Sequence, residues 1–159
     1  MEARLSYANA APQGYRAVVA LNSYVDDCGL DPILLELVKL RASQINGCAY
    51  CLDMHSKDLR ALGEREERIY ALSAWHETPF YTERERAALL WAEALTLVNE
   101  DHVPDEIYEE ARRHFNEEAL VNLTLAIATV GVWNRLCIAF RSVPGAYASS
   151  RTPLATAAD

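Results

Sequence analysis

The sequence predicts an all-α fold of about seven helices. Apolar residues recur at helical spacing between clear capping signals, and no run of alternating β-branched residues is bounded by turn residues. A length of 159 residues, 51% of them hydrophobic, fits a single domain with a substantial core. We expect residues 1–145 to form that domain and residues 146–159, rich in Ala, Ser, Thr and Pro, to form a flexible tail.

Capping residues set the bounds of the expected helices. Asp31 followed by Pro32 is an N-cap with proline at the first helical position. The Asn46-Gly47 pair breaks the helix that begins there, and Thr82 opens a capping box. Residues 1–11 are expected to be a loosely held lead-in. The expected helices cover residues 12–28, 32–46, 48–62, 64–75, 82–99, 104–114 and 117–140.

Charge and hydropathy exclude several classes of protein. The net charge is −8 and no cluster of Lys and Arg is present, so we expect neither nucleic-acid binding nor docking on an anionic membrane. The N-terminus has no apolar segment typical of a secretory signal. Residues 119–140 are apolar, but Asn134 and Arg135 interrupt them, so we interpret this segment as a core helix of a soluble, cytoplasmic protein.

The residues that carry chemistry are concentrated around one predicted helix start. Cys48, Cys51 and His55 are three and four residues apart, which places them along one helix face. Gly47 directly before them puts the thiols in the first turn, where the helix dipole favours a thiolate. His55 can take a proton from Cys51, and Glu36, which has apolar neighbours on both sides, can orient that histidine.

This arrangement predicts thiol redox chemistry. A thiolate attacks a peroxide O–O bond and becomes a sulfenic acid, which a second cysteine condenses to a disulfide. Cys51 is nearer the base and is the expected nucleophile, so Cys48 is the expected resolving cysteine. The scheme predicts that Cys51→Ser abolishes turnover and that Cys48→Ser stalls after the first oxidation.

Two other interpretations of the thiol pair remain open. The pair can be small buried hydrophobes, which is also how we interpret the isolated Cys28 and Cys137. A zinc site would need Glu36 as a fourth ligand beside the two thiols and His55, which is an uncommon structural set. Asn134 and Arg135, polar within an apolar helix, are expected to join a hydrogen-bond network between helices or subunits.

A family resemblance rests on the same residues. Glu36, then Cys48 twelve residues later, then Cys51 and His55, resemble the Glu-x11-Cys-x-x-Cys-x3-His signature of AhpD-like alkylhydroperoxidases, which belong to the carboxymuconolactone decarboxylase family. In the best-known members the residue before the second cysteine is a histidine; here it is Tyr50, a poor base near neutral pH, so the relay has one imidazole fewer. The resemblance includes residues 39–47 and 133–136 and spans roughly residues 15–142.

The resemblance implies a specific assembly and activity. It implies an AhpD-like helical bundle in a homo-oligomer, a trimer or a hexamer, with the active site near a subunit interface. It also implies hydroperoxide reduction with Cys51 as the peroxidatic and Cys48 as the resolving cysteine. Glu36 and His55 would form the proton relay.

We therefore expect an antioxidant oxidoreductase, a peroxidase that acts on hydroperoxides. It would be reduced by an external dithiol, such as a thioredoxin-like protein or a protein-bound lipoyl group. We expect no haem, flavin or metal cofactor. The alternatives are an oligomer that senses redox state or exchanges disulfides without turning over peroxide, and an enzyme of the carboxymuconolactone decarboxylase type.

Overall fold

The computed structural model describes residues 2–153, which contain nine α-helices, one 3-10 helix and no strand. The predicted all-α class is therefore confirmed over this range. The elements are α1 (Tyr7–Ala10), α2 (Pro12–Asp26), α3 (Pro32–Asn46), α4 (Ala49–Leu62), α5 (Glu66–Tyr70), η1 (Leu72–Glu77), α6 (Glu83–Thr96), α7 (Val98–Asp101), α8 (Asp105–His114) and α9 (Glu117–Phe140).

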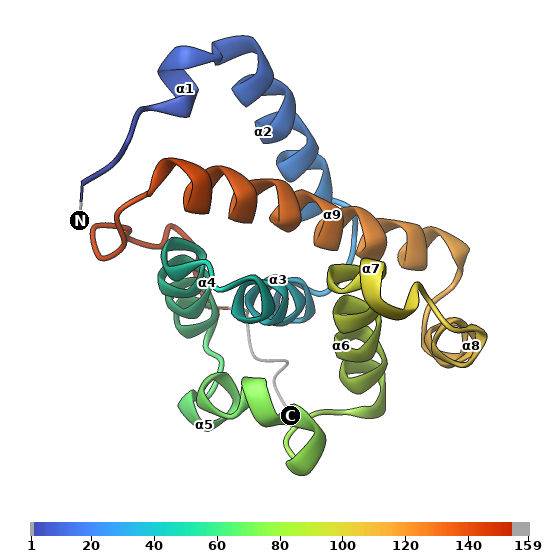
Figure 1. Cartoon of the computed structure of the whole chain (residues 1–159). Helices are drawn as coiled ribbons and strands as arrows, with labels where there is room; N and C mark the ends of the chain where they lie inside the picture. Colours follow the sequence, from blue (N-terminus) through green and yellow to red (C-terminus); the bar gives the residue numbers. More distant parts are fainter. Residues whose placement is uncertain (1, 154–159) are drawn as a thin grey trace.

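Helix α9 crosses the molecule, with α2 on one side and α3, α4 and α6 on the other (Figure 1). Helix α3 lies between α4, α6 and α9, and every residue from Leu34 to Leu40 is buried. A helix enclosed by three neighbours must be apolar around its whole circumference, which explains its continuous apolar run. Glu36 and Lys39 are the charged residues in that run, and they therefore need internal partners.

The core is built from leucines contributed by different helices. Leu37 of α3, Leu59 of α4, Leu89 of α6 and Leu123 of α9 are all fully buried. Burying each such side chain stabilises the fold by about 1.5–3 kcal/mol. This packing fixes α3, α4 and α9 relative to one another, and these are the helices that carry the residues of the candidate site.

The expected number of seven helices is too low, for local reasons. The helix expected over residues 64–75 is split into α5 and η1. Within η1, Ala74 has a non-helical φ of −119°. The helix expected over residues 82–99 ends at Thr96, and the short α7 follows. Helix α1 forms within the expected lead-in, where Ser6 caps it by accepting a hydrogen bond from the backbone of Asn9.

By length and composition alone, Glu117–Phe140 is apolar enough to cross a membrane. In this structure it packs against α2, α3, α4, α6 and α8 as the central helix of the bundle. Its polar residue Asn134 is buried and bonded to α3, accepting from Asn46 at 2.8 Å and donating to Ser43 at 3.0 Å. The predicted bonds between helices are thus present for Asn134, whereas Arg135 donates to the Gly131 carbonyl of its own helix at 2.9 Å.

Both terminal segments fold back onto the bundle. The Arg4 backbone N–H donates to the Phe140 carbonyl at 2.9 Å, which holds the expected lead-in against the end of α9. Near the other end, Lys57 of α4 donates to the carbonyl oxygens of Gly145 and Tyr147 at 3.1 and 3.0 Å. Residues 146–153 of the expected flexible tail are thus placed beside α4, and residues 154–159 lie outside the described residues.

Candidate functional site

A tight turn between α3 and α4 positions the two cysteines of the motif. Gly47 adopts a left-handed conformation with φ of 68°, which glycine adopts without steric cost, and it ends α3. Cys48 follows as the N-cap of α4, and its Sγ accepts a hydrogen bond from the Cys51 backbone N–H at 3.4 Å. The helix therefore starts where the sequence predicts, with both thiols at its N-terminal end.

One helical turn after Cys51, His55 meets Glu36 of α3. The His55 Nδ1 lies 2.7 Å from Glu36 Oε2, and both side chains are almost completely buried. Lys39 Nζ bonds the other carboxylate oxygen at 3.1 Å and Asp26 of α2 at 2.8 Å. The structure therefore brings the expected carboxylate and imidazole into direct contact and adds a buried ammonium beside them.

The charge of Glu36 is fixed by these partners. Burial alone would raise its pKa, but the hydrogen bond and charge of His55 and the ammonium of Lys39 outweigh burial and lower the pKa to about 2. Burial would likewise lower the pKa of Lys39, whereas the carboxylates of Glu36 and Asp26 raise it. Both groups are therefore charged at neutral pH.

One ring nitrogen of His55 is hydrogen-bonded to Glu36, and the other has no hydrogen-bond partner among the described residues. In the neutral imidazole, an Nδ1 proton donated to the Glu36 carboxylate leaves Nε2 as an acceptor. Nε2 is buried and has no hydrogen-bond partner among the residues that the structure describes. A buried imidazole nitrogen with an open lone pair, held in place by a carboxylate, is suited to accept a proton from a bound group.

The segment after α9 completes this acid–base cluster. Arg151 Nη2 lies 3.2 Å from Asp26 and 3.4 Å from Glu36. The Tyr147 hydroxyl donates to the carboxylate of Asp58, a buried residue of α4, at 2.8 Å. None of these three contributors was singled out from the sequence, and no spacing signal links residues 147 and 151 to the motif.

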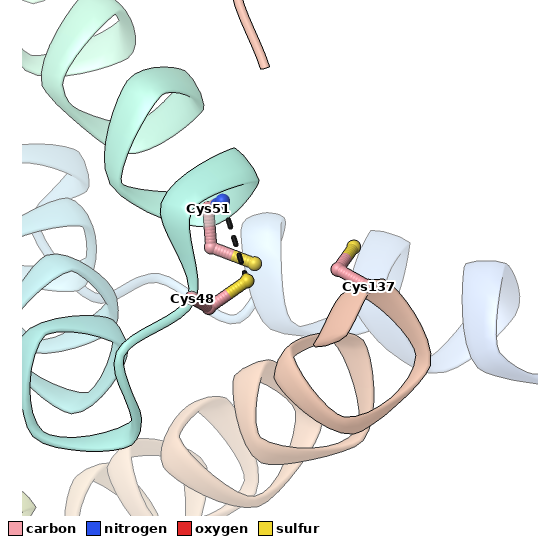
Figure 2. A group of neighbouring side chains, drawn as sticks. All are labelled: Cys48, Cys51 and Cys137. Atoms are coloured by element: carbon pink, nitrogen blue, oxygen red, sulfur yellow. Dashed lines mark hydrogen bonds between the residues drawn. The ribbon is translucent and has the colours of Figure 1, made fainter. Parts of the chain in front are cut away.

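The structure also adds a third thiol to the site. The Sγ atoms of Cys48, Cys51 and Cys137 all lie within 4.8 Å of one another, and all three residues are buried. Figure 2 shows Cys137 on α9 beside the pair at the start of α4. The interpretation of Cys137 as an isolated small hydrophobe is therefore wrong, because helix packing places it among the thiols.

The three thiols do not ionise independently. Hydrogen bonds from the thiols of Cys48 and Cys51 hold the pKa of Cys137 well below its ordinary value, although burial opposes this. The same contacts with Cys137, together with burial, raise the pKa of Cys51 and of Cys48. Within the cluster, these contacts favour a negative charge on Cys137 over one on Cys51 or Cys48.

Tyr7 of α1 supports that thiolate from the other side. Its hydroxyl oxygen lies 3.8 Å from the Cys137 Sγ. Burial raises the pKa of Tyr7 to about 12, so the phenol keeps its proton and can donate it to a thiolate at Cys137.

A cavity of about 510 Å³ joins the thiol and acid–base clusters. Cys51 and Cys137 line it at one end, and Glu36 and His55 line it as well, whereas Cys48 does not. A volume of this size holds a small organic molecule. The aromatic residues of its wall are Tyr7, Tyr15, Tyr50, Trp133 and Tyr147.

Tyr50, the residue in place of the family's histidine, packs against the three cysteines and faces the cavity. Burial, followed by the charges of Cys137 and Cys51, raises its pKa, so it stays a neutral donor. His76, a histidine outside the motif, is 56% exposed and hydrogen-bonds Glu93 at 3.3 Å, away from this cavity.

Among residues 2–153, two groups of side chains have the donor chemistry of metal ligands. One is the set of three cysteines, and the other consists of Glu36, His55 and Asp58. The first lacks the fourth ligand of a closed zinc site. In the second, Glu36 already carries Lys39 and Arg151 as cationic partners, which disfavours a further cation. The zinc ligands considered from the sequence are thus split, with Cys48 and Cys51 in the first group and Glu36 and His55 in the second.

Comparison with known proteins identifies chains similar in sequence and fold. The chain is 44% identical over 139 residues to the uncharacterised protein YdfG of Bacillus subtilis (strain 168), covering 87% of this chain and 95% of YdfG. Its fold matches the crystal structure of ATU0492 from Agrobacterium tumefaciens with a TM-score of 0.89 and 44% identity, over 92% and 100% of the two chains. ATU0492 is described as a protein of unknown function and a candidate antioxidant defence protein AhpD.

A third similar structure is the debrominase Bmp8 without ligand, with a TM-score of 0.74 and 26% identity over 87% of this chain and 74% of Bmp8. Residues 12–94, which include the α3–α4 pair and its motif, match the carboxymuconolactone decarboxylase family directly. The chain therefore belongs to the carboxymuconolactone decarboxylase family and has the fold of its AhpD-like members.

Proposed function

We propose that this protein is a thiol-dependent peroxidase that reduces organic hydroperoxides, with Cys51 as peroxidatic cysteine and Cys48 as resolving cysteine. The observation that carries the proposal is the shared cavity. Cys51 lines the same pocket as His55, whose Nε2 is an open acceptor held in place by Glu36. A peroxide bound there meets a sulfur nucleophile and a proton acceptor together.

The reaction balances with the thiols and one external reductant. The Cys51 thiolate attacks the distal oxygen of ROOH, the O–O bond breaks, and RO⁻ leaves and takes a proton to become ROH. The Cys48 thiolate then attacks the sulfenic sulfur of Cys51, the S–O bond breaks and, with one proton, water leaves as the disulfide forms. An external dithiol, thioredoxin-like or lipoyl, supplies the two electrons that restore both thiols.

His55, Glu36 and Tyr50 have the roles of proton handling in this proposal. His55 accepts the proton that Cys51 loses and returns it to the leaving alkoxide. The carboxylate of Glu36 stabilises the imidazolium during that interval, at 2.7 Å. Tyr50, neutral and against the thiols, donates a hydrogen bond to the departing oxygen.

We also propose that the chain assembles as a homo-oligomer, a trimer or a hexamer. Helices α2 and α9 both carry exposed apolar side chains, including Tyr24 at 50% and Val121 at 58%, which a second copy could cover. A cytoplasmic location would suit a site that depends on reduced thiols.

One observation favours a second candidate function, the reductive removal of halogen from an aromatic ring. The cavity wall is rich in aromatic rings, and the similar protein Bmp8 is a debrominase, a variant of which was solved with 2,3,4-tribromopyrrole. Two thiols can supply the electrons: an aryl bromide and two thiols give the arene, a disulfide and hydrogen bromide. Release of bromide from such a substrate would distinguish this function from peroxide reduction.

Two further alternatives differ in what they require of the thiols. A redox-sensing or disulfide-exchanging oligomer would form the disulfide but consume no peroxide. A lactone decarboxylase needs no thiol pair, and three clustered cysteines beside the cavity disfavour it.

The proposal is tested by peroxide consumption with a panel of dithiol donors. We expect the wild-type protein to turn over organic hydroperoxides with at least one donor and Cys51→Ser to lose about three orders of magnitude or more in rate. Cys28→Ser, a change of the cysteine outside the cluster, should leave the rate unchanged. Equal rates for the Cys51→Ser and Cys28→Ser proteins would refute the role of Cys51.

A further inference from the structure

The position of Cys137 calls for a role that the pair of cysteines in the motif does not include. Cys137 comes from the last helix, yet its Sγ lies within 4.8 Å of both other sulfurs. Its exposed fraction is 4%, so its contacts are with the protein interior and the cavity. A buried thiol next to two others that undergo oxidation will itself encounter the oxidised sulfur.

Cys137 and Cys48 differ in whether they line the cavity and in the hydrogen bond that their sulfur makes. Cys51 and Cys137 both line it, whereas Cys48 does not. The Cys48 sulfur serves as the N-cap acceptor of α4, taking the Cys51 backbone N–H at 3.4 Å. To attack a sulfenic acid on Cys51, the Cys48 sulfur must release its hydrogen bond with the Cys51 backbone N–H. Cys137 caps no helix, so its attack leaves the start of α4 unchanged.

We propose that Cys137 is a third redox-active thiol of this site, which resolves the sulfenic acid of Cys51 by forming a disulfide between α4 and α9. Cys48 then receives the disulfide by exchange. The proposal rests on the proposed peroxidase function and changes which cysteine resolves first.

The steps balance in atoms and electrons. Peroxide oxidises Cys51 to the sulfenic acid and leaves as ROH. The Cys137 thiolate attacks the sulfur of Cys51, an S–S bond forms, the S–O bond breaks and, with one proton, water leaves. The Cys48 thiolate next attacks the sulfur of Cys51, which forms the Cys48–Cys51 disulfide and releases Cys137 as a thiolate. An external dithiol reduces that disulfide.

Geometry and electrostatics both suit Cys137 as the resolving nucleophile. A disulfide needs the sulfurs about 2.05 Å apart, so each pair must close by less than about 3 Å from its present separation of at most 4.8 Å. Tyr7 donates to the Cys137 sulfur from 3.8 Å and stabilises its thiolate. The lowered pKa of Cys137, caused first by the Cys48 and Cys51 thiols, acts in the same direction.

The decisive variant is Cys48→Ser in the full-length protein. Serine is a preferred N-cap, so α4 keeps its start and the protein should fold. We expect one equivalent of cumene hydroperoxide, added to the reduced variant, to give a Cys51–Cys137 disulfide, identified by peptide mass mapping without reduction. A Cys51 sulfenic acid that dimedone traps while Cys137 remains a free thiol would overturn the proposal. That stalled state is the outcome expected if Cys48 alone can resolve.

A second oxidant separates this inference from the peroxidase function itself. Diamide takes two hydrogens from neighbouring thiols, becomes the hydrazine and needs no peroxidase activity. If peroxide leaves the cysteines of the wild-type protein reduced, the proposed function fails, and the diamide result decides about Cys137. A Cys51–Cys137 disulfide in the Cys48→Ser protein supports the proposal, and a free Cys137 after diamide treatment overturns it. The control Cys48→Ser/Cys137→Ser protein should form no disulfide within this cluster.

Discussion

The thiol cluster and the acid–base cluster that line the cavity each take a residue from α4, Cys51 and His55, but they are stabilised by opposite electrostatic means. At the thiol end, around Cys48, Cys51 and Cys137, the groups that favour a negative charge on Cys137 are neutral donors, chiefly the other two thiols and Tyr7. One turn later, Glu36 is held by full charges, with Lys39 at 3.1 Å and Arg151 at 3.4 Å. The thiol end can change its bonding and charge, whereas the acid–base end is fixed in charge.

In the proposed reaction, electron transfer therefore belongs to the thiol end and proton transfer to the acid–base end. A thiolate held by weak neutral donors can leave its contacts and form a covalent bond. A carboxylate held by buried cations keeps its charge and can orient an imidazole without titrating. Perturbing the acid–base end should therefore change proton transfer and stability, and perturbing the thiol end should change thiol ionisation.

The largest effect is expected when the proton acceptor is removed. In His55→Asn, the amide can still donate to Glu36, but the acceptor at Nε2 is lost. We expect the rate of Cys51 oxidation by an organic hydroperoxide to fall about 10²–10⁴-fold, the usual contribution of a general base. Stopped-flow measurement of the change in tryptophan fluorescence gives this rate.

His76→Asn is the matched control for that variant, since His76 also contacts a glutamate but is exposed and away from the cavity. Its oxidation rate should equal that of the wild-type protein. If both variants oxidise at the wild-type rate, protons are not handled by His55.

The next effect tests the fixed charge of the acid–base end. Glu36→Gln removes the negative charge and leaves Lys39 and Arg151 to share Asp26. Breaking a buried ion pair from one side costs about 3–5 kcal/mol of unfolding free energy. Urea denaturation measures the cost, and Glu118→Gln, at an exposed position in the first turn of α9, should change it by less than about 0.5 kcal/mol.

The acid–base end also predicts how stability depends on pH. The pKa of Glu36 is lowered from 4.5 to about 2, so its contribution is fully present above pH 4.5 and is lost as the pH falls toward 2. The shift corresponds to about 3 kcal/mol over that interval. Urea midpoints measured from pH 6 to pH 2.5 should fall more steeply for the wild-type protein than for Glu36→Gln, and parallel curves would place the titration elsewhere.

The smallest effect concerns the thiol end. Tyr7→Phe removes one neutral donor from Cys137 and should raise the apparent pKa of the thiolate by about half a unit, in keeping with one weak hydrogen bond. Thiolate absorbance at 240 nm against pH reports this change. Tyr15→Phe is the control, because Tyr15 lies beside Tyr7 with ring centres 6.2 Å apart. Identical titrations of the two variants would show that Tyr7 does not hold the charge.

The parts of the site that the sequence predicted are those whose contacts are local. Gly47 ends one helix, Cys48 starts the next, and Cys51 and His55 follow at fixed helical spacing, so position alone determines their neighbours. The contact of His55 with Glu36 needs α3 and α4 to pack against each other, which the short connection of Gly47 and Cys48 favours. The geometry of the α3–α4 pair could therefore be predicted, while the catalytic roles of its residues remain proposals.

The remaining contributors are brought in by packing over long sequence separations. Cys137 lies in the most apolar helix, where a cysteine is indistinguishable from any small hydrophobe. Tyr7 and Arg151 come from the first and last described segments, whose composition suggests little order. These residues are brought together by the packing of α9 against α4 and by the terminal segments, which fold back onto the bundle. Neither of these two features can be predicted from residue spacing.

The Gly47 turn also sets the rotational phase of α4. Successive residues of an α-helix are rotated by about 100° and raised by about 1.5 Å. One residue inserted between Gly47 and Cys51 would leave both helices able to form. If α4 kept its packing against α3 and α9, Cys51 and His55 would rotate away from the cavity; if they stayed in the cavity, that packing would be lost. A relative with a longer turn would thus share this bundle without sharing its chemistry, and the length of that one connection separates the two.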